Sequence, residues 1–580
     1  MKKIYFLLFV YINVYAQMPF NTTQKQLDKN YVKAAINGGN SKFWNLNGNQ
    51  HVSYEVPKGK GVHAQFSNSL WIGGYDNQGQ LHLCAETYRQ NGVDFWPGPL
   101  DTDYVDVFNS VNNIPYNKLW KVDCDDINTF ASAFNLGSVT ANTYTVPNDL
   151  LTYPAKGSGN FQRYMERFYD AGNNGQYASQ TQGDYPIIKG HQQILSIYND
   201  NNGTHTETYG SLPMGLEIHE RAYCYFDPNL PDSMQAVNYT TFYHYTIYNR
   251  SDNKYNNVYL SDWSDFDLGY YNDDYIGTDT VNNFTYGYNG DDNDQSIPGN
   301  KGYGKKPPVI SHALIDTDCS SDGIDNDADG VIDEVGEHFV LNRSTFYNNN
   351  IGSFPQQTTN PDIAAEYYGY MSGKWKDGTP FTYGGNAYGG TVNSNYVYTG
   401  NPSTNIGWTE ASAGNTPGDR RVISSSGPFT LLGRSKFEWA FAVVFSQDTT
   451  QEVNTIAQFN TRVQRDVRNV RYYDKMHQQP QCLPAITFTP PPTGIQEIKN
   501  NLLGAIIYPN PSSDKVNIVI SENVVFADVT LFDVGGRLMT KTNIIKNQQT
   551  TLDISEIERG IYFVEISSGN LKSIQKLIKN

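Results

Sequence analysis

The segment 502–580 carries the sequence pattern that most constrains how this chain can fold. Its apolar residues alternate with polar ones over short runs, as Val516, Ile518 and Ile520 do, and turn residues separate one run from the next. The pair Gly535-Gly536 supplies the positive φ angles that a tight hairpin needs. Alternation with a period of two places every second side chain on one face of a strand. The segment is therefore predicted to form a small antiparallel β-sandwich.

Four further features of this segment form a recognisable set: Pro509-Asn510-Pro511, the Gly536-Arg537 turn, Gly560-Ile561-Tyr562, and lysines in the last strand. Together they resemble the type A sorting domain of the type IX secretion system of Bacteroidetes. The resemblance implies that residues 502–580 are handled by the type IX secretion machinery. It also implies export across the outer membrane, followed by release or attachment at the cell surface. The alternative is a β-module that only caps the chain.

The N-terminus has the layout of a signal peptide over residues 1–16. Lys2-Lys3 is a basic start, residues 4–12 are apolar, and Val14-Tyr15-Ala16 offers small residues at the cleavage positions. The apolar run is about half of the roughly 20 residues that cross a membrane. We expect cleavage after Ala16, no transmembrane segment in the mature chain, and a protein that is soluble once it is released.

The body of the chain, residues 17–479, has the composition of a turn-rich β protein. The chain holds 50 glycines and 43 tyrosines, and only 17 % of its residues are charged. We therefore predict a mainly β fold with one or more β-sandwich units in the body. Because a body this long exceeds what one core usually supports, two or more packed units are expected. The predicted segments are 17–260, 261–340 and 341–479, followed by a proline-containing linker, 480–501.

One long helix is predicted near the end of the body. Ile456, Phe459, Val463, Val467 and Val470 follow helical spacing. We place this helix at 452–476, with its arginines as either a solvated face or partners for acidic residues elsewhere in the chain.

Negative charge is concentrated in one segment of the body. The chain has a net charge of −17, and residues 262–337 hold 18 Asp and Glu against three Lys. Such a surface repels nucleic acids and anionic membranes and attracts divalent cations. We therefore expect no nucleic-acid partner.

The sharpest motif in this segment predicts a structural calcium site. Asp325, Asp327 and Asp329 place three carboxylates at alternate positions of a short loop, where they supply the hard oxygen ligands that calcium prefers. Gly330 is the sharp turn, and Val331 would contribute its carbonyl. Three neighbouring carboxylates repel one another, so a cation would also rigidify the loop.

The remaining ligands distinguish this motif from an EF-hand. An EF-hand requires a glutamate at the twelfth position, where Gly336 stands. Asp333, Glu334 or Glu337 would have to close the shell, and Ile332 would point into the core. The loop resembles the Asp-rich calcium loops of thrombospondin type 3 repeats, and its alternative is an acidic turn without an ion.

A second group of acids lies on a predicted strand. Asp265 and Asp267 share one face, so they repel each other unless a cation or a base lies between them. Elsewhere, five cysteines leave at least one thiol unpaired, and no Cys-x-x-Cys pair is present. The pairing of these cysteines stays open.

Aromatic residues offer candidate ligand contacts in two regions. Trp71, Phe95 and Trp96 suit either a sugar-stacking platform or the core of a sandwich, and the core is favoured. Their surroundings resemble the opening of a group of uncharacterised Bacteroidetes surface proteins. Residues 349–418 indicate long exposed loops or an insertion, with further candidates for which packing within turns is the favoured alternative. These are Trp375, Tyr383, Tyr388, Tyr396, Tyr398 and Trp408.

No catalytic motif is present among those sought. The chain lacks His-Glu-x-x-His, Gly-x-Ser-x-Gly and phosphate-binding loops, and His244, inside the strand-like run 240–249, is predicted to be structural. The sequence therefore favours a non-enzymatic secreted or cell-surface protein that binds a glycan, matrix or surface component. The alternative is a secreted polysaccharide hydrolase whose carboxylates are brought together by the fold.

Overall fold

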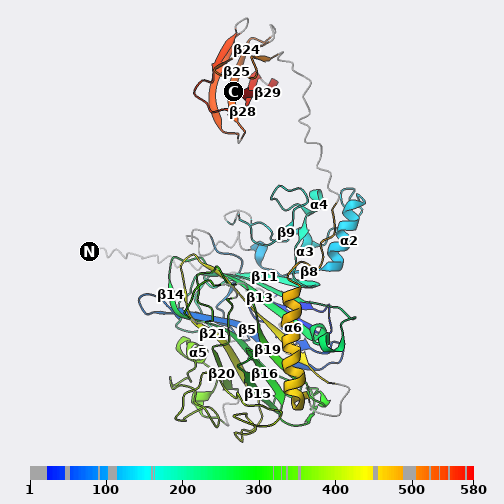
Figure 1. Cartoon of the computed structure of the whole chain (residues 1–580), viewed down its shortest axis with the longest axis vertical. Helices are drawn as coiled ribbons and strands as arrows, with labels where there is room; N and C mark the ends of the chain where they lie inside the picture. The colour runs from blue at the N-terminus through cyan, green and yellow to red at the C-terminus, as the bar shows by residue number, and fades with distance from the viewer. Residues whose placement is uncertain are drawn as a thin grey trace, which may run out of the picture. The chain divides into compact units, whose positions relative to one another are not determined.

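The computed structural model describes most of the chain (Figure 1). The described residues are 23–45, 53–88, 92–101, 114–157, 161, 163–317, 319–327, 330–334, 337–349, 354–448, 455–486, 505–520, 524–534, 536–545, 549–568 and 571–580. The predicted signal peptide, 1–16, lies outside them. The chain divides into two compact units, Met1–Phe488 and Thr489–Asn580.

Two antiparallel sheets form the centre of the first unit. Within the described residues the larger has nine strands, in the order β15-β16-β19-β22-β13-β12-β11-β7 with β8 also paired to β11. These are β7 (Trp96–Pro97), β8 (Trp120–Asp123), β11 (Gln192–Asn199), β12 (Leu216–Cys224), β13 (Thr240–Asn249), β15 (Asp274–Asp279), β16 (Phe284–Asn289), β19 (Val309–Ile315) and β22 (Lys436–Ser446).

The smaller central sheet has the order β20-β21-β14-β5-β6. Its strands are β5 (Ser67–Tyr75), β6 (Leu81–Cys84), β14 (Tyr255–Asp265), β20 (Arg343–Asn348) and β21 (Arg420–Leu431). A third sheet, β1-β2-β3-β4, comprises β1 (Gln24–Leu27), β2 (Lys33–Asn37), β3 (Tyr54–Glu55) and β4 (His63–Gln65). Two-stranded ribbons are formed by β9 (Phe168–Tyr169) with β10 (Tyr185–Pro186), and by β17 (Asn293–Asp294) with β18 (Gly304–Lys305).

Strand β13 shows why the larger sheet is buried on both faces. Tyr243, Tyr245 and Ile247 belong to the core that the two central sheets share, whereas Phe242 belongs to the core on the opposite face. Alternating side chains of a strand point to opposite faces, so a strand that is apolar on both faces needs a layer on each side. The predicted sandwich is confirmed, and helices cover its second face.

Those helices include the long helix predicted near the end of the body. The chain winds through a 3₁₀ turn η5 (Thr455–Gln458) and a π turn η6 (Phe459–Val463) into α6 (Gln464–Met476). Phe459, Val463, Val467 and Val470 are buried, as their spacing predicts, and α6 lies against β19 and β22 (Figure 1). The predicted start at 452 falls outside the described residues.

A third core was not predicted. It gathers helices α2 (Cys124–Asn135) and α3 (Asn148–Leu151) over β8 and β11, and α4 (Ser179–Gln182) contacts α3. Ile127, Phe130 and Phe134 of α2 are buried there. The other helical elements are α5 (Ala364–Ser372), η1 (Ile114–Tyr116), η3 (Asp232–Tyr239) and η4 (Gln356–Thr358).

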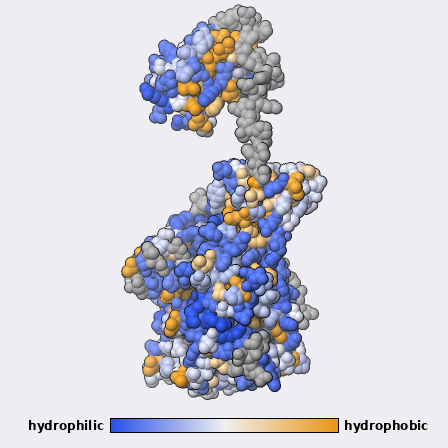
Figure 2. All heavy atoms as spheres, turned by 45° about the vertical axis from the view of Figure 1, so that its right-hand side comes forward, coloured by the Kyte–Doolittle hydropathy of each residue, from blue (hydrophilic) through white to orange (hydrophobic). Residues whose placement is uncertain are grey.

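The predicted segments of the body are not separate compact units. Residue 260 lies inside β14, and the larger sheet takes strands from all three of 17–260, 261–340 and 341–479. Because hydrogen bonds of one sheet join the three segments, they form a single unit that extends to Phe488. The apolar side chains gather between its layers, and the face shown in Figure 2 is largely hydrophilic, with scattered hydrophobic patches.

The second unit is the β-sandwich that the alternating pattern predicts. One sheet holds β23 (Ile506–Tyr508), β24 (Lys515–Val519) and β27 (Thr550–Asp553). The other holds β25 (Phe526–Asp533), β26 (Leu538–Ile545), β28 (Gly560–Ser568) and β29 (Leu571–Lys579). Val516, Ile518, Val529 and Leu531 are buried in their shared core. The hairpin between β25 and β26 turns at Gly536, whose φ is +80°.

Candidate functional site

The predicted calcium loop follows β19 and is held to the body at both ends. Cys319 and Ile324 are buried in the core between the two central sheets. The Cys319 N–H donates a hydrogen bond to the Glu337 carbonyl at 3.4 Å, which brings the start and the end of the loop together. The acidic turn between them is thereby folded back on itself.

The structure brings three carboxylates of this loop together. One oxygen from each of Asp325, Asp327 and Glu337 lies within 4.8 Å of the others. Glu337 is buried; its Oε1 accepts the Asn326 N–H at 2.6 Å, while its Oε2 has no hydrogen-bond partner among the described residues. A buried carboxylate oxygen without a donor fits a metal ligand, and three hard oxygen donors suit calcium.

The other predicted ligands have different positions. Asp333 accepts the Gly323 N–H at 2.8 Å through its Oδ1, and Glu334 accepts the Glu337 N–H at 3.2 Å through its main-chain carbonyl. Asp329 lies outside the described residues. Of the three acids that the sequence offered to close the shell, Glu337 is the one that joins the cluster.

Two apolar residues of the loop differ from expectation. Ile332 was predicted to point into the core, but 58 % of it is exposed, and Val331 is 53 % exposed. Ile324, on the N-terminal side of the acids, is the buried anchor instead. The first half of the loop therefore packs on the core, and the second half turns outward at Gly330, whose φ is +97°.

Neighbouring carboxylates make the electrostatic potential at the loop negative. Burial, with Glu337 and Asp333 nearby, raises the pKa of Asp322 to about 6. Asp322 loses its proton less readily than a carboxyl group in water, because a further negative charge is costly there. A bound cation would remove that cost.

A cavity of about 360 Å³ borders the loop at Glu337. His244 lines it, and its Nε2 lies 3.1 Å from a carboxylate oxygen of Glu438, which agrees with the predicted structural role. Burial, with Lys189 nearby, lowers the pKa of His244 to about 4.

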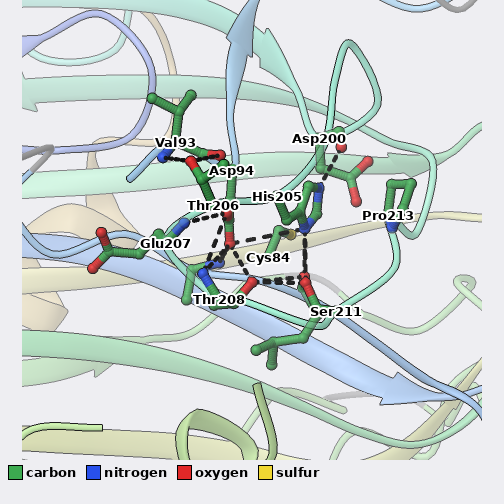
Figure 3. Close-up of polar contacts among 12 residues, drawn as sticks. Cys84, Val93, Asp94, Asp200, His205, Thr206, Glu207, Thr208, Ser211 and Pro213 are labelled. Carbon is green, nitrogen blue, oxygen red and sulfur yellow. Dashed lines mark hydrogen bonds and ion pairs between the residues drawn. The ribbon is translucent and has the colours of Figure 1, made fainter. Parts of the chain in front are cut away.

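Another polar cluster, which the sequence did not reveal, gathers residue types used by cysteine hydrolases (Figure 3). His205 lies beside Cys84, but its two ring nitrogens are 2.8 Å from the Leu83 carbonyl and 2.7 Å from the Asp200 carbonyl. Burial raises the pKa of the Cys84 thiol well above its usual value, and a protonated thiol is a poor nucleophile. The cluster ties a loop to β6 and does not have the chemistry of a catalytic triad.

The candidate aromatic contacts are mostly core residues. Trp71, Phe95 and Trp96 are buried, in agreement with the favoured interpretation. Most of the described part of 349–418 is loop, as predicted, but several of its aromatic residues are not exposed. Helix α5 lies within it, and Trp375, Tyr398 and Trp408 are buried in the main core.

Comparison with known proteins identifies the second unit. Residues 506–580 match the family described as the secretion system C-terminal sorting domain. This match supports export of the chain as cargo of the type IX secretion system, to the cell surface or the medium. A comparison with curated proteins finds no match to this chain.

A helix that spans a membrane must be both long and apolar. In the part of the chain that the structure describes, no helix is both long enough and apolar enough for a crossing.

Proposed function

We propose that this protein is exported by the type IX secretion system and acts outside the cell as a non-enzymatic β-rich protein with structural calcium. Its role there is to bind a glycan, a matrix component or another surface component. Two observations support the proposal: the match of residues 506–580 to the sorting domain, and the convergence of Asp325, Asp327 and Glu337.

Calcium would be held by the loop that joins β19 to β20. Asp325, Asp327 and Glu337 would contribute side-chain oxygens, and Asp329, the Val331 carbonyl, Asp333 and Glu334 remain predicted ligands. The ion would neutralise charges that otherwise repel, so the loop and the core beneath it would be more stable with calcium than without it.

The proposed binding role rests on the aromatic side chains that are exposed at the surface. Tyr383 is 54 % exposed and packs against Trp408, with the two ring centroids 4.9 Å apart. A partly exposed ring held by a buried one suits stacking on a sugar. A glycan and protein binding screen on the mature chain, with Tyr383→Ala for comparison, would test this part. Binding that is equal in both proteins would remove Tyr383 from the proposal.

The two described carboxylate clusters suit cation binding better than polysaccharide hydrolysis. The two carboxylate clusters that converge in the described residues have oxygens within 4.8 Å of one another. Glycosidases keep their two working carboxyl groups roughly 5 to 10 Å apart, with space for a sugar or a water molecule. Close clusters of this kind are better suited to holding a cation.

Deleting residues 506–580 tests the export part. The full chain and the truncated chain would be expressed in cells with a working type IX system and in cells without one. We expect only the full chain to reach the surface or the medium, and only in the competent cells. Normal export of the truncated chain would overturn this part.

The calcium part is tested by bound calcium and by thermal melting of the mature chain. We expect a chelator to lower the melting temperature. Asp327→Asn should lose one bound calcium per chain and show a smaller chelator effect, whereas Asp292→Asn, an exposed aspartate of the same acidic segment, should behave like the parent chain. Unchanged calcium content in Asp327→Asn would refute a site in this loop.

A further inference from the structure

A second group of carboxylates lies where β14 ends and β21 begins. One oxygen from each of Asp265, Asp267 and Asp419 lies within 4.8 Å of the others. Asp265 is the last residue of β14, and Asp419 immediately precedes β21, which pairs with β14. The sheet pairing therefore holds two of these acids side by side, and Asp267 joins them from the loop that follows β14.

Among the described residues, Arg421 is the base that pairs with this cluster, and it does not balance the charge. Arg421 forms an ion pair with Asp265, with Nη2 2.9 Å from Oδ2, and a second ion pair with Asp419. Three carboxylates therefore face one guanidinium. Asp274, also buried, adds negative charge beside Asp267.

Two carboxylate oxygens at this place have no donor. In Asp265, which is 0 % exposed, Oδ2 accepts the Tyr88 hydroxyl at 2.7 Å, but Oδ1 has no hydrogen-bond partner among the described residues. The same holds for Oδ1 of Asp274, whose Oδ2 accepts the Leu268 N–H at 2.9 Å. Unpartnered buried carboxylate oxygens are costly, and either a proton or a cation would satisfy them.

The protein environment disfavours full ionisation of the group. Asp265 and Asp267 are buried and lie close to Asp419, so their charges repel one another where water screens them poorly. A divalent cation would supply the missing positive charge.

The cluster also has an open side. Asp267 lines a cavity of about 490 Å³, together with His63, Phe66, Ser296 and Lys301. A cation held by Asp267 can therefore exchange with solvent, and coordination positions that the protein does not fill would face the cavity. Calcium usually takes six to eight oxygen ligands, more than these three side chains supply by single contacts.

We propose that Asp265, Asp267 and Asp419 bind a second divalent cation, calcium by the chemistry of the donors, with its open coordination positions facing this cavity. The site is separate from the loop that contains Asp325, and it does not depend on that loop binding calcium. Oxygen atoms of a ligand in the cavity would complete the coordination shell.

Calcium stoichiometry tests the proposal. Equilibrium dialysis of the mature chain with calcium should find two bound ions. Asp267→Asn should bind one fewer, and Asp292→Asn should bind as many as the parent chain. The substitution also removes a negative charge that repels the Asp265 and Asp419 carboxylates. Without calcium, Asp267→Asn should therefore melt at or above the melting temperature of the parent.

A second variant and a second readout keep the result interpretable. Asp419→Asn should also lose one ion, and terbium luminescence excited through Tyr88, which contacts Asp265, should fall in both variants. If both variants retain the calcium content and the terbium signal of the parent, the proposal is wrong and the acids are held by shared protons. Loss of an ion in Asp327→Asn alone would support the loop site and refute this one.

Discussion

A disulfide joins Cys124, the first residue of α2, to Cys482, which follows α6, across a sequence separation of 358 residues. The segment after α6 is further fixed by the Tyr185 hydroxyl, which donates to the Pro484 carbonyl at 2.8 Å, and by the Asn135 side chain, which donates to the Ala485 carbonyl at 2.9 Å. The first part of the predicted linker, 480–486, therefore belongs to the body. Disulfide closure suits a protein that is exported to an oxidising environment.

Replacing Cys482 with serine should destabilise the body. The disulfide restricts the unfolded chain over a long loop, and its loss should cost about 2–5 kcal/mol. Thermal melting of the mature chain would show this as a lower midpoint for Cys482→Ser than for the parent under oxidising conditions.

Cys224→Ala is the matched control, because Cys224 is a buried free thiol outside the disulfide. A reducing agent should lower the melting temperature of the parent and of Cys224→Ala, but not of Cys482→Ser. A parent protein that is indifferent to the reducing agent would contradict the role given to the disulfide.

Arg471 of α6 should be the arginine on which docking of this helix depends. Its guanidinium donates to the carbonyls of Asn282, Asn283 and Leu314, at distances of 2.5 to 2.9 Å, and burial lowers its pKa to about 10. Truncation removes the side-chain donor of all three carbonyls, although the Asn283 carbonyl keeps the Leu314 N–H at 3.3 Å. We expect Arg471→Ala to cost about 2–4 kcal/mol.

Arg468 provides the comparison on the same helix, because it is exposed. In urea denaturation, the parent and Arg468→Ala should have the same midpoint. Arg471→Lys should have a lower midpoint, and Arg471→Ala the lowest. Lysine keeps a charge but not the planar set of donors. Equal midpoints for the two alanine variants would rule out this role.

The strands and helices that follow a regular apolar pattern could be predicted from the sequence. The strand-like run 240–249 and the helical spacing from Phe459 to Val470 identified elements that are buried as expected. The sequence did not predict that Trp375 and Trp408 fill the main core from irregular segments, because side chains in loops follow no period and are buried only through contacts with distant residues.

The same limit applies to the two acidic clusters. Asp325 and Asp327 were identified by their spacing in one loop, whereas Glu337 joins them only because the loop folds back. Asp265 and Asp267 were recognised as mutually repelling, but their partners Asp419 and Arg421 come from β21 and the residue before it. Pairing of distant strands brings these residues together, and a single sequence does not reveal that pairing.

Asp474 should link α6 to the larger sheet through two tyrosines. Its Oδ1 accepts the hydroxyls of Tyr223 and Tyr225 at 2.8 and 2.9 Å, and all three residues are buried. Asp474→Ala removes the shared acceptor and leaves the Tyr225 hydroxyl only the His477 carbonyl at 3.4 Å, so we expect a loss of about 2–4 kcal/mol in the free energy of unfolding.

Asp474→Asn keeps an oxygen in the same place and should recover much of that loss. Urea denaturation of the two variants, each also combined with Tyr223→Phe, would measure the coupling directly. If Tyr223→Phe has the same effect in the parent and in Asp474→Ala, the two residues are not coupled and the link is not supported.

Glu207 should make the stability of the body depend on pH near neutrality. It is buried, its Oε1 accepts the hydroxyls of Thr87 and Tyr367 at 2.5 and 3.1 Å, and burial, with Asp94 nearby, raises its pKa to about 7. The folded-state pKa therefore lies above the unfolded value, so the folded protein holds this proton more tightly than the unfolded chain does.

The sign of the effect follows from that difference. As the pH rises from about 4.5 to above 7, the unfolded chain loses this proton before the folded protein does, so stability falls across that window, by up to about 3 kcal/mol for this group. Glu207→Gln cannot ionise and lacks this contribution. Urea denaturation at pH 5, 6, 7 and 8, with calcium held constant, should show that the free energy of unfolding of the variant increases relative to that of the parent as the pH rises. Because other buried acids change the stability of both proteins alike, the difference between the two reports Glu207 alone. A difference that stays constant from pH 5 to pH 8 would show that Glu207 ionises no less readily in the folded protein than in the unfolded chain.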